Sequence, residues 1–531
     1  MRTHLSGETM SETPKSARQS IFKSAGFQET LSQSIKQIQK TYLSDQIPWV
    51  IGYSGGKDST AVLQLVWLAL SKLAPKDRLK TVHVISTDTL VENPVVAAWV
   101  DRSHEVMGES AAQLGLPIYP HKLTPDVQNT FWVNLIGRGY PAPRPKFRWC
   151  TERMKIRPAD AFISDVVKQN GEAIVVLGTR KAESSVRAAR MTANDEGRIR
   201  ENLSSHSSLP NAFIYSPIAE WTNDDVWLFL LQVKNPWGHD NKSLLSMYQG
   251  ASQDAECPVV LDTSTPSCGD SRFGCWVCTL VEKDKSMSAM IQNDEEKEWM
   301  APLLELRNSL DEPDHDKRDF RRMSGAVQLF NNDDNRPIPG PYTQATREDW
   351  LRRLLAAQEI VRNHPKAPQE VRGIELVTQD ELHEIRRIWV AEKYEVEDRL
   401  PTIYAEATDR SFAAKRLDDT QPFGAEEMTI LKNAAGEDQI HFELVRELLQ
   451  VQRSYRASSR RAKLFERLEE AFKRGFYNDV EDATGRAARR RNLGALLETV
   501  GEIGNGGEAA AKALQRELEG LTEVQKSDAA K

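Results

Sequence analysis

The chain has 531 residues, of which 28% are charged and 40% are hydrophobic, and its formal net charge is −7. That length predicts two or three domains, and the charge does not by itself indicate a nucleic-acid-binding protein. The longest apolar stretch, at residues 61–70, is interrupted by Gln64 and is too short to cross a bilayer. Residues 1–20 lack the apolar core of a signal peptide, so we expect a cytoplasmic protein without membrane contact.

Strands and helices are predicted to alternate through the first half of the chain. Residues 1–20 are predicted to be disordered, and residues 21–45 have the apolar spacing of a helix. The next segments are predicted as strand, helix, strand, helix, strand and strand, at 48–53, 58–72, 81–86, 94–114, 118–123 and 173–177. This alternation predicts an α/β fold, a Rossmann-like parallel sheet with helices on both faces, whose ligands bind at the carboxyl ends of the strands.

The rest of the chain changes character twice. Residues 236–290 are rich in Gly, Pro, Ser and Cys and are predicted to form an irregular, cysteine-rich insertion. Long polar helices are predicted from residue 291 to 503, among them 347–362, 379–393 and 442–474, and residues 504–531 are predicted to be a flexible tail. The expected organisation is therefore an α/β domain at 21–235, the insertion at 236–290 and a helical C-terminal region at 291–503.

A glycine-containing loop joins the first predicted strand to its helix. It consists of Ser54, Gly55, Gly56, Lys57, Asp58 and Ser59. Glycines let backbone amides approach an anion closely, and the amides at the helix start, the lysine and the serine hydroxyls complete a phosphate-binding cradle. It is not a Walker A loop, because Ile51 stands where that motif has glycine and Asp58 where it has Ser or Thr. The alternative is an ordinary turn before a helix.

The loop resembles the pyrophosphate loop (PP-loop) of enzymes that split ATP into AMP and pyrophosphate, which have an adenine nucleotide α-hydrolase-like fold. Other segments resemble motifs of the phosphoadenosine phosphosulfate (PAPS) reductase-like family: Asp88-Thr89 with Glu92-Asn93-Pro94, Arg148-Trp149-Cys150-Thr151 with Lys155, Gly178-Thr179-Arg180 with Arg187, and Pro217-Ile218 with Asp225-Val226-Trp227. The resemblance covers roughly residues 45–290. It implies an ATP site made by the loop together with Thr89, Gly178 and Arg187.

ATP cleavage next to the α-phosphorus requires charge compensation for the leaving pyrophosphate. Lys57 is suited to that role, and Lys155, Arg180 and Arg187 are cations suited to a polyanionic substrate. Asp58 and Asp88 are candidate oxygen ligands for Mg²⁺. As alternatives, Asp58 could stabilise a helix N-terminus and Asp88 could cap a helix.

Four of the five cysteines lie between residues 257 and 278. Cys275 and Cys278 have the two-residue spacing that lets two thiolates reach one metal centre. With Cys268 and the distant Cys150 they could hold either a structural zinc or a [4Fe–4S] cluster, and the spacing does not separate the two. Cys257 is expected to be free, or to replace Cys268 as a ligand.

The segment 268–279 resembles the cysteine signature of the DndC family, the sulfurtransferases of bacterial DNA phosphorothioation. That resemblance implies a [4Fe–4S] cluster held by Cys150, Cys268, Cys275 and Cys278. It further implies ATP pyrophosphatase activity, DNA as the substrate whose non-bridging phosphate oxygen is replaced by sulfur, a cysteine desulfurase as sulfur donor, and other subunits of the modification and restriction system as partners.

Other functions use the same loop. A sulfonucleotide reductase needs a cysteine in a mobile C-terminal tail, but no cysteine follows Cys278, and the adjacent cysteine pair of the cluster-bearing reductases is absent. An RNA thiolase shares the loop and often a cluster, so the loop does not exclude it. A non-catalytic, nucleotide-binding assembly subunit is a further alternative.

Nucleic-acid contacts have two candidate regions. Basic residues gather at 453–463 and 486–491, where a solvated helix face paired with glutamates is the favoured interpretation over phosphate binding. A stretch with aromatic and basic residues, 131–146, could stack on or clamp a nucleotide, or its Phe131 and Trp132 could belong to a core.

Overall fold

A computed structural model describes residues 19–196, 200, 202–251, 273–330, 335–413, 424–455 and 463–503. The described residues fall into two compact units. The sheet unit comprises those of Met1–Pro125, Trp149–Leu304 and Lys366–Glu370, and the helical unit those of Asp126–Arg148, Glu305–Pro365 and Val371–Lys531. Residues 126–148, which we expected in the α/β domain, thus belong to the helical unit.

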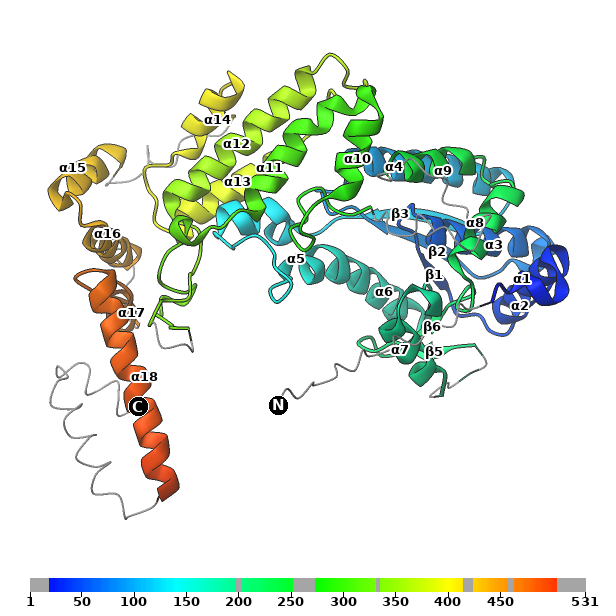
Figure 1. The fold of residues 1–531 in the computed structure, drawn as a ribbon, viewed down its shortest axis with the longest axis horizontal. Helices are drawn as coiled ribbons and strands as arrows, with labels where there is room; N and C mark the ends of the chain where they lie inside the picture. The colour runs from blue at the N-terminus through cyan, green and yellow to red at the C-terminus, as the bar shows by residue number, and fades with distance from the viewer. Residues whose placement is uncertain are drawn as a thin grey trace, which may run out of the picture. The chain divides into compact units, whose positions relative to one another are not determined.

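The sheet unit is built on six strands in the order β3-β2-β1-β4-β6-β5. The strands are β1 (Trp49–Gly52), β2 (Val82–Thr87), β3 (Ile118–Leu123), β4 (Ala173–Val176), β5 (Ser204–Ser205) and β6 (Ala212–Tyr215). All neighbours pair in parallel except β5, which runs antiparallel to β6 at the edge. The predicted Rossmann-like parallel sheet is confirmed, and β5 and β6 extend it beyond the strands expected from the sequence (Figure 1).

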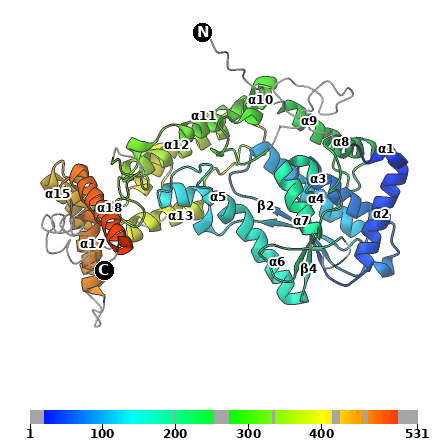
Figure 2. The same ribbon diagram turned by 60° about the horizontal axis from the view of Figure 1, so that its bottom comes forward.

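Helices cover both faces of this sheet because successive strand residues point to opposite sides. Trp49 and Ile51 of β1 pack into one core with the helices on that side, whereas Val50 packs into a second core with α6. Figure 2 shows the sheet between α6 and the helices α3 and α4. The helices of this unit are α1 (Phe22–Ala25), α2 (Phe27–Leu43), α3 (Lys57–Ser71), α4 (Pro94–Gln113), α5 (Trp149–Thr151), the π-helical turn η4 (Glu152–Ile156), α6 (Arg157–Asn170), α7 (Ser185–Glu196), α8 (Asn223–Gln232), α9 (Asn241–Gly250) and α10 (Lys285–Asn293).

The α3 helix is buried on nearly all sides, which fixes its first turn. Its residues from Ala61 to Trp67 are all buried, and it packs against both α2 and α8. A helix that is apolar all round belongs in a core. The loop before α3 is therefore attached to a deeply buried helix of the sheet unit.

The helical unit contains the second half of the chain. Its helices are α11 (Ala301–Asp311, from Glu305 on), α12 (Gln344–Asn363), α13 (Gln379–Arg387), α14 (Leu400–Thr408), α15 (Ala425–Ala435), α16 (Gln439–Ser454), α17 (Leu464–Gly475) and α18 (Val480–Ile503). Two buried ion pairs, Arg347 with Glu395 and Arg386 with Asp398, connect its elements. Among the helices that the structure describes, none combines the length and apolar character needed to cross a membrane.

The 131–146 segment contributes buried side chains to the helical unit. Phe131 and Trp132 are buried and pack edge to face, and Arg144 is ion-paired with Asp311. The core interpretation is therefore correct for the two aromatic rings, and they are not available to stack on a nucleotide.

Candidate active site

The glycine-containing loop lies where β1 ends and α3 begins. Gly55 has a φ of +72°, and a Cβ there would lie 2.5 Å from a Val100 methyl and 3.2 Å from the ring of Trp99. The Trp99 indole also donates a hydrogen bond to the Gly55 carbonyl over 3.2 Å. Only glycine meets both the conformational and the spatial requirement at this position.

Hydrogen bonds inside the loop are centred on Ser59. Its hydroxyl donates to the Gly56 carbonyl over 2.9 Å and accepts from the Ser54 amide over 3.2 Å, and the Ser54 and Ser59 hydroxyls are 3.2 Å apart. The turn is therefore closed by its own side chains. A ligand would find the loop preformed, which lowers the entropy cost of binding.

A tyrosine from α9 lies against the start of α3. The Tyr248 hydroxyl accepts a hydrogen bond from the Lys57 amide over 3.3 Å, and the Lys57 ammonium lies 5.4 Å from the centre of the ring. Burial raises the pKa of Tyr248 to about 12, so the phenol is neutral at physiological pH. No local pattern points to this residue, because the contact joins positions 191 residues apart.

Asp58 connects the loop to the end of β4. One carboxylate oxygen accepts from Arg180 Nε over 2.7 Å, and the other lies 3.3 Å from Lys57 Nζ. Gly178 permits this approach, since a Cβ there would lie 2.9 Å from the Asp58 carbonyl carbon. The structure thus brings Lys57 and Asp58, which follow β1, together with Arg180, which follows β4. Arg187 is more remote: it lies on α7 and is ion-paired with Glu183.

Asp88 follows β2 and is also paired with a cation. One of its oxygens accepts from the Leu90 amide over 2.8 Å, and the other lies 3.0 Å from Lys122 Nζ. Lys122 is held in addition by Asp101, at 2.8 Å. Burial lowers the pKa of Lys122, but its hydrogen bonds to Asp101 and Asp88 outweigh that effect and raise it.

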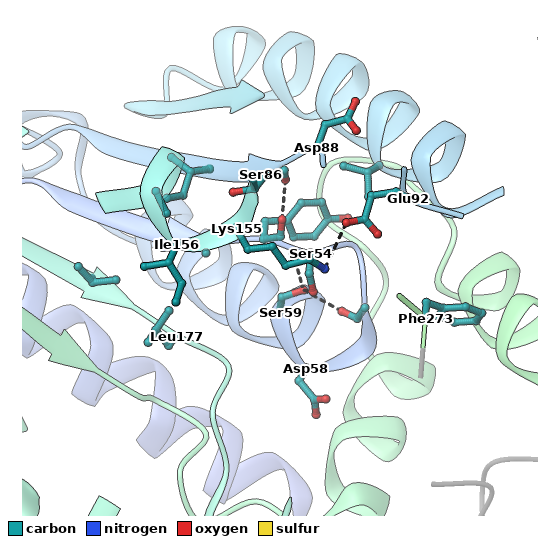
Figure 3. Close-up of a pocket in the computed structure, with 18 of the residues that line it drawn as sticks. Ser54, Asp58, Ser59, Ser86, Asp88, Glu92, Lys155, Ile156, Leu177 and Phe273 are labelled. Carbon is teal, nitrogen blue, oxygen red and sulfur yellow. Dashed lines mark hydrogen bonds and ion pairs between the residues drawn. The ribbon is translucent and has the colours of Figure 1, made fainter. Parts of the chain in front are cut away.

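These groups surround a cavity of about 1030 Å³ (Figure 3). Of the predicted site residues, eight line it: Ser54, Gly56, Lys57, Asp58, Ser59, Asp88, Lys155 and Arg180. Gly55, Thr89, Gly178 and Arg187 are not among the lining residues. Apolar side chains such as Val96, Ile163 and Leu177 form other parts of the wall. Polar and charged side chains are the majority of the lining. A cavity of this size, with polar groups that converge beside apolar walls, suits a nucleotide-sized ligand.

The cysteine segment is docked beside this cavity. The Trp276 amide donates to the Val91 carbonyl over 2.9 Å, and Cys275 forms a β-bridge with Glu92. The Cys275 sulfur lies 3.4 Å from the Thr89 hydroxyl and 3.7 Å from a Glu92 carboxylate oxygen. Thr89, which was expected to bind the nucleotide, is instead fully buried at this contact.

Lys155 and Glu92 separate the Cys275 thiol from the cavity. The two side chains form an ion pair of 3.3 Å, and both line the cavity (Figure 3). Burial, and then the charge of Glu92, raise the pKa of Cys275 to about 12, although Lys155 opposes the shift. Burial lowers the pKa of Lys155, but the charges of Cys275 and Glu92 outweigh it and raise the pKa.

The described cysteines do not by themselves form a metal site. Cys150, Cys275 and Cys278 stand as thiols, and burial followed by the neighbouring Cys278 raises the pKa of Cys150. Within the part of the chain that the structure describes, no group of three or more Cys, His, Asp or Glu side chains could hold a metal ion. Cys257 and Cys268 lie outside the described residues.

The basic groups at the C-terminal end are largely paired within the helical unit. Arg486 is ion-paired with Asp482 at 2.7 Å, and Arg491 donates to Asn335 and to the Phe330 carbonyl. Glu469 is ion-paired with Lys473, a lysine outside the two basic groups. Residues 456–462 of the first group lie outside the described residues. These contacts agree with the favoured interpretation of a paired helix face.

Comparison with known proteins identifies the domain that carries the cavity. Residues 48–239 match the family model "Phosphoadenosine phosphosulfate reductase domain". A curated relative, the uncharacterized protein MJ0066 of Methanocaldococcus jannaschii, is 27% identical over 200 residues, which are 38% of this chain and 35% of that protein. The match thus spans about a third of the relative's length.

Solved structures show weaker likeness. Candida glabrata FMN adenylyltransferase with FMN and an ATP analog is 14% identical, with 42% of this chain and 59% of that chain covered and a TM-score of 0.22. The U34-tRNA thiolase NcsA of Methanococcus maripaludis, with its [4Fe–4S] cluster, is 13% identical, with 54% and 79% covered and a TM-score of 0.26. Neither likeness is high enough to support an argument about this chain.

Proposed function

We propose that this chain, which carries a PAPS reductase-like domain at residues 48–239, is an ATP pyrophosphatase and sulfurtransferase of the DndC type. It would activate a DNA backbone phosphate by adenylation and replace one non-bridging oxygen with sulfur. The observation that carries the proposal is the preformed loop at the start of α3, next to Lys57 and Arg180 in a cavity of about 1030 Å³.

The first step would be attack by a non-bridging oxygen of the diester on the α-phosphorus of ATP. A new phosphorus–oxygen bond forms, the bond between the α-phosphorus and the oxygen that bridges to the β-phosphorus breaks, and pyrophosphate leaves with that bond's electron pair. The amides at the start of α3 and the Lys57 ammonium would hold the pyrophosphate and offset its growing charge. Arg180, which bonds to Asp58, would keep the start of α3 in position for that contact.

The second step would exchange oxygen for sulfur at the activated phosphate. The terminal sulfur of a persulfide attacks the diester phosphorus, and AMP leaves with the former non-bridging oxygen and the bonding electron pair. A second thiolate then attacks the persulfide's inner sulfur, which gives a disulfide and leaves the phosphorothioate. We propose a cysteine desulfurase as the source of persulfide and other subunits of the modification and restriction system as partners.

Mg²⁺ bound with ATP would supply further charge compensation. Asp58 and Asp88 are the carboxylates that fit this role by their chemistry and by lining the cavity. Each is engaged by a cation, Asp58 by Lys57 and Arg180 and Asp88 by Lys122. For a metal ion to bind these carboxylates, the Lys57 and Lys122 ammonium groups would have to turn towards the phosphates, while Arg180 keeps its bond to the other oxygen of Asp58.

The [4Fe–4S] cluster on Cys150, Cys268, Cys275 and Cys278 remains part of the proposal, with zinc as the alternative metal. Cys150, Cys275 and Cys278 are the described members of that set, and Cys275 lies next to Glu92, which lines the cavity. Anaerobic purification with iron, sulfide and zinc analysis tests it. Zinc without iron would refute the assignment of a [4Fe–4S] cluster.

Pyrophosphate release tests the activity itself. Lys57→Ala should lower the rate of ATP conversion to AMP and pyrophosphate by about 10²-fold, the size expected for loss of one transition-state cation. The matched control is Lys72→Ala, which removes an exposed lysine just after α3 and should leave the rate unchanged. ADP as the product would refute the proposal.

The acceptor needs its own measurement, because an RNA thiolase would use the same adenylation chemistry on a base. DNA from cells with and without the protein is digested with nucleases, and dinucleotides with phosphorothioate linkages are measured by mass spectrometry. Sulfur in these linkages only when the wild-type protein is present supports the proposal. Thiolated RNA bases without phosphorothioate linkages in DNA would refute the proposal and favour an RNA thiolase.

A further inference from the structure

A second cavity lies within the helical unit. It has a volume of about 700 Å³ and is lined by the last residues of α12, by the loop after it, and by Arg410, which follows α14. All of its lining residues belong to the helical unit. Neither the family match at residues 48–239 nor the motifs of the sequence include them.

The cavity lining carries more positive than negative charge. Arg362, Arg372 and Arg410 line it together with a single carboxylate, that of Glu359. Arg362 and Arg410 both bond to the same oxygen of that carboxylate, Oε1. One negative charge is thus divided between two guanidinium groups, and a third guanidinium is added by Arg372.

The arginines have more donors than these contacts use. A guanidinium has five N–H groups; among the described contacts, Arg362 uses Nε for the Ile374 carbonyl at 2.6 Å and Nη1 for Glu359 at 3.1 Å. These bonds fix the plane of the Arg362 guanidinium. Arg410 is exposed to solvent, so its remaining donors can reach a ligand without a rearrangement of the core, and Arg372 lies at the surface of the same cavity.

Helix ends explain only part of this charge. Both α12, at Asn363, and α14, at Thr408, end near the cavity, and the carbonyl ends of helices attract cations. Arg362 and Arg410 satisfy that attraction, one for each helix. Arg372 lies ten positions beyond Arg362 in the loop and is not required for either helix end.

We infer that this cavity binds the phosphodiester backbone of a polynucleotide. Planar arginine forks match phosphate oxygens in pairs, which makes arginine the preferred residue for this anion. A volume of about 700 Å³ exceeds that of one phosphate group and leaves room for a nucleotide unit. The inference rests on the proposed function in that the acceptor is a polynucleotide, but the binding it describes requires no ATP.

The experiment uses the full chain and the double variant Arg372→Gln/Arg410→Gln. The matched control is Arg352→Gln/Arg353→Gln, which removes two exposed charges from α12 outside the cavity. Fluorescence anisotropy with a labelled DNA duplex, without ATP, gives the dissociation constant at several salt concentrations. The association constant falls as salt rises, and each lost phosphate contact should make the slope of log K against log salt less steep by about 0.9. The slope of the cavity variant should therefore be less steep than that of the control by about 2.

Several results would overturn the inference. They are an equal slope in the two double variants, no binding of DNA by the wild type, and a loss of inorganic phosphate binding in the cavity variant with its DNA slope unchanged. The last would assign the cavity to a free small anion. If the double variant does not fold, the single variant Arg372→Gln should lose about 0.9 of slope.

Pyrophosphate release, measured on the same proteins, separates this inference from the proposed function. The cavity variant should keep the wild-type rate, because none of its changed residues lines the ATP cavity. If the wild type releases no pyrophosphate, the proposed function is refuted. The difference in salt dependence between the two double variants would still test the DNA-binding inference.

Discussion

Gly178→Ala is a direct test of how the end of β4 positions the phosphate loop. The added Cβ would lie 2.9 Å from the Asp58 carbonyl carbon, 3.0 Å from its oxygen and 3.1 Å from the Ser59 amide nitrogen. All three atoms are backbone atoms in the first turn of α3. Ordinary contact begins at 3.4 Å, so the two segments must separate by about half an ångström.

The cost follows from the rigidity of both segments. β4 is buried throughout, and α3 is held by its core contacts, so relaxation is limited. Overpacking of this kind costs about 1–3 kcal/mol of unfolding free energy, which should lower the melting temperature by on the order of 5 °C. A misplacement of 1 Å at a catalytic group can cost about 10²-fold in rate, so a shift half as large should cost about tenfold.

The assay combines thermal unfolding with pyrophosphate release at saturating ATP. Gly250→Ala is the matched control, since a Cβ there meets nothing within 4 Å and the helix end tolerates alanine. The control should keep wild-type stability and rate. Wild-type stability and rate in Gly178→Ala would refute the idea that backbone contact with β4 sets the position of the loop.

Three further predictions follow from the described contacts. Gly55→Ala, at a φ of +72° and with a valine methyl 2.5 Å from the new Cβ, should abolish detectable pyrophosphate release in a protein that still folds, as circular dichroism would check. Burial lowers the pKa of His104 to about 4, below its unfolded value of 6.5, so the unfolded state binds the proton more tightly. The free energy of unfolding should therefore fall by about 3 kcal/mol as the pH drops from 6.5 to 4, and His104→Gln should flatten that pH dependence in denaturant titrations. Asp398→Ala, which strands the buried Arg386, should cost about 3–5 kcal/mol, whereas Asp349→Ala at an exposed ion pair should cost less than about 1 kcal/mol in the same titrations.

The parts of the fold that the sequence predicted well are those with long, local signals. The loop at 54–59 and the start of α3 were predicted because glycines, a lysine and an apolar helix follow one another directly. The helix at 94–114 matches α4 within a residue because Asn93 caps it and Pro94 fits its first turn. The strand at 118–123 matches β3.

The missed parts depend on contacts between distant residues. β5 is a run of two residues, too short for a periodic signal. β6 has four residues, as β1 and β4 do, and it becomes a strand through its parallel pairing with β4. The expected helix at 442–474 is divided, since α16 ends at Ser454 and α17 begins at Leu464. Membership of residues 126–148 in the helical unit follows from tertiary contacts such as the bond from the Trp389 indole to the Ile136 carbonyl, which no local pattern encodes.

The distribution of charge in the proposed ATP cavity would let an acidic chain hold a polyphosphate. Each lysine and arginine discussed at the cavity has a carboxylate partner: Lys57 and Arg180 share Asp58, Lys122 has Asp88, and Lys155 has Glu92. Such pairs hold the cations in place without a net positive surface. Binding of a phosphate group then exchanges one anionic partner for another, so affinity depends on geometry more than on total charge. Neutralising a carboxylate, as in Glu92→Gln, should therefore release Lys155 from its partner and alter ATP binding as strongly as loss of the lysine itself.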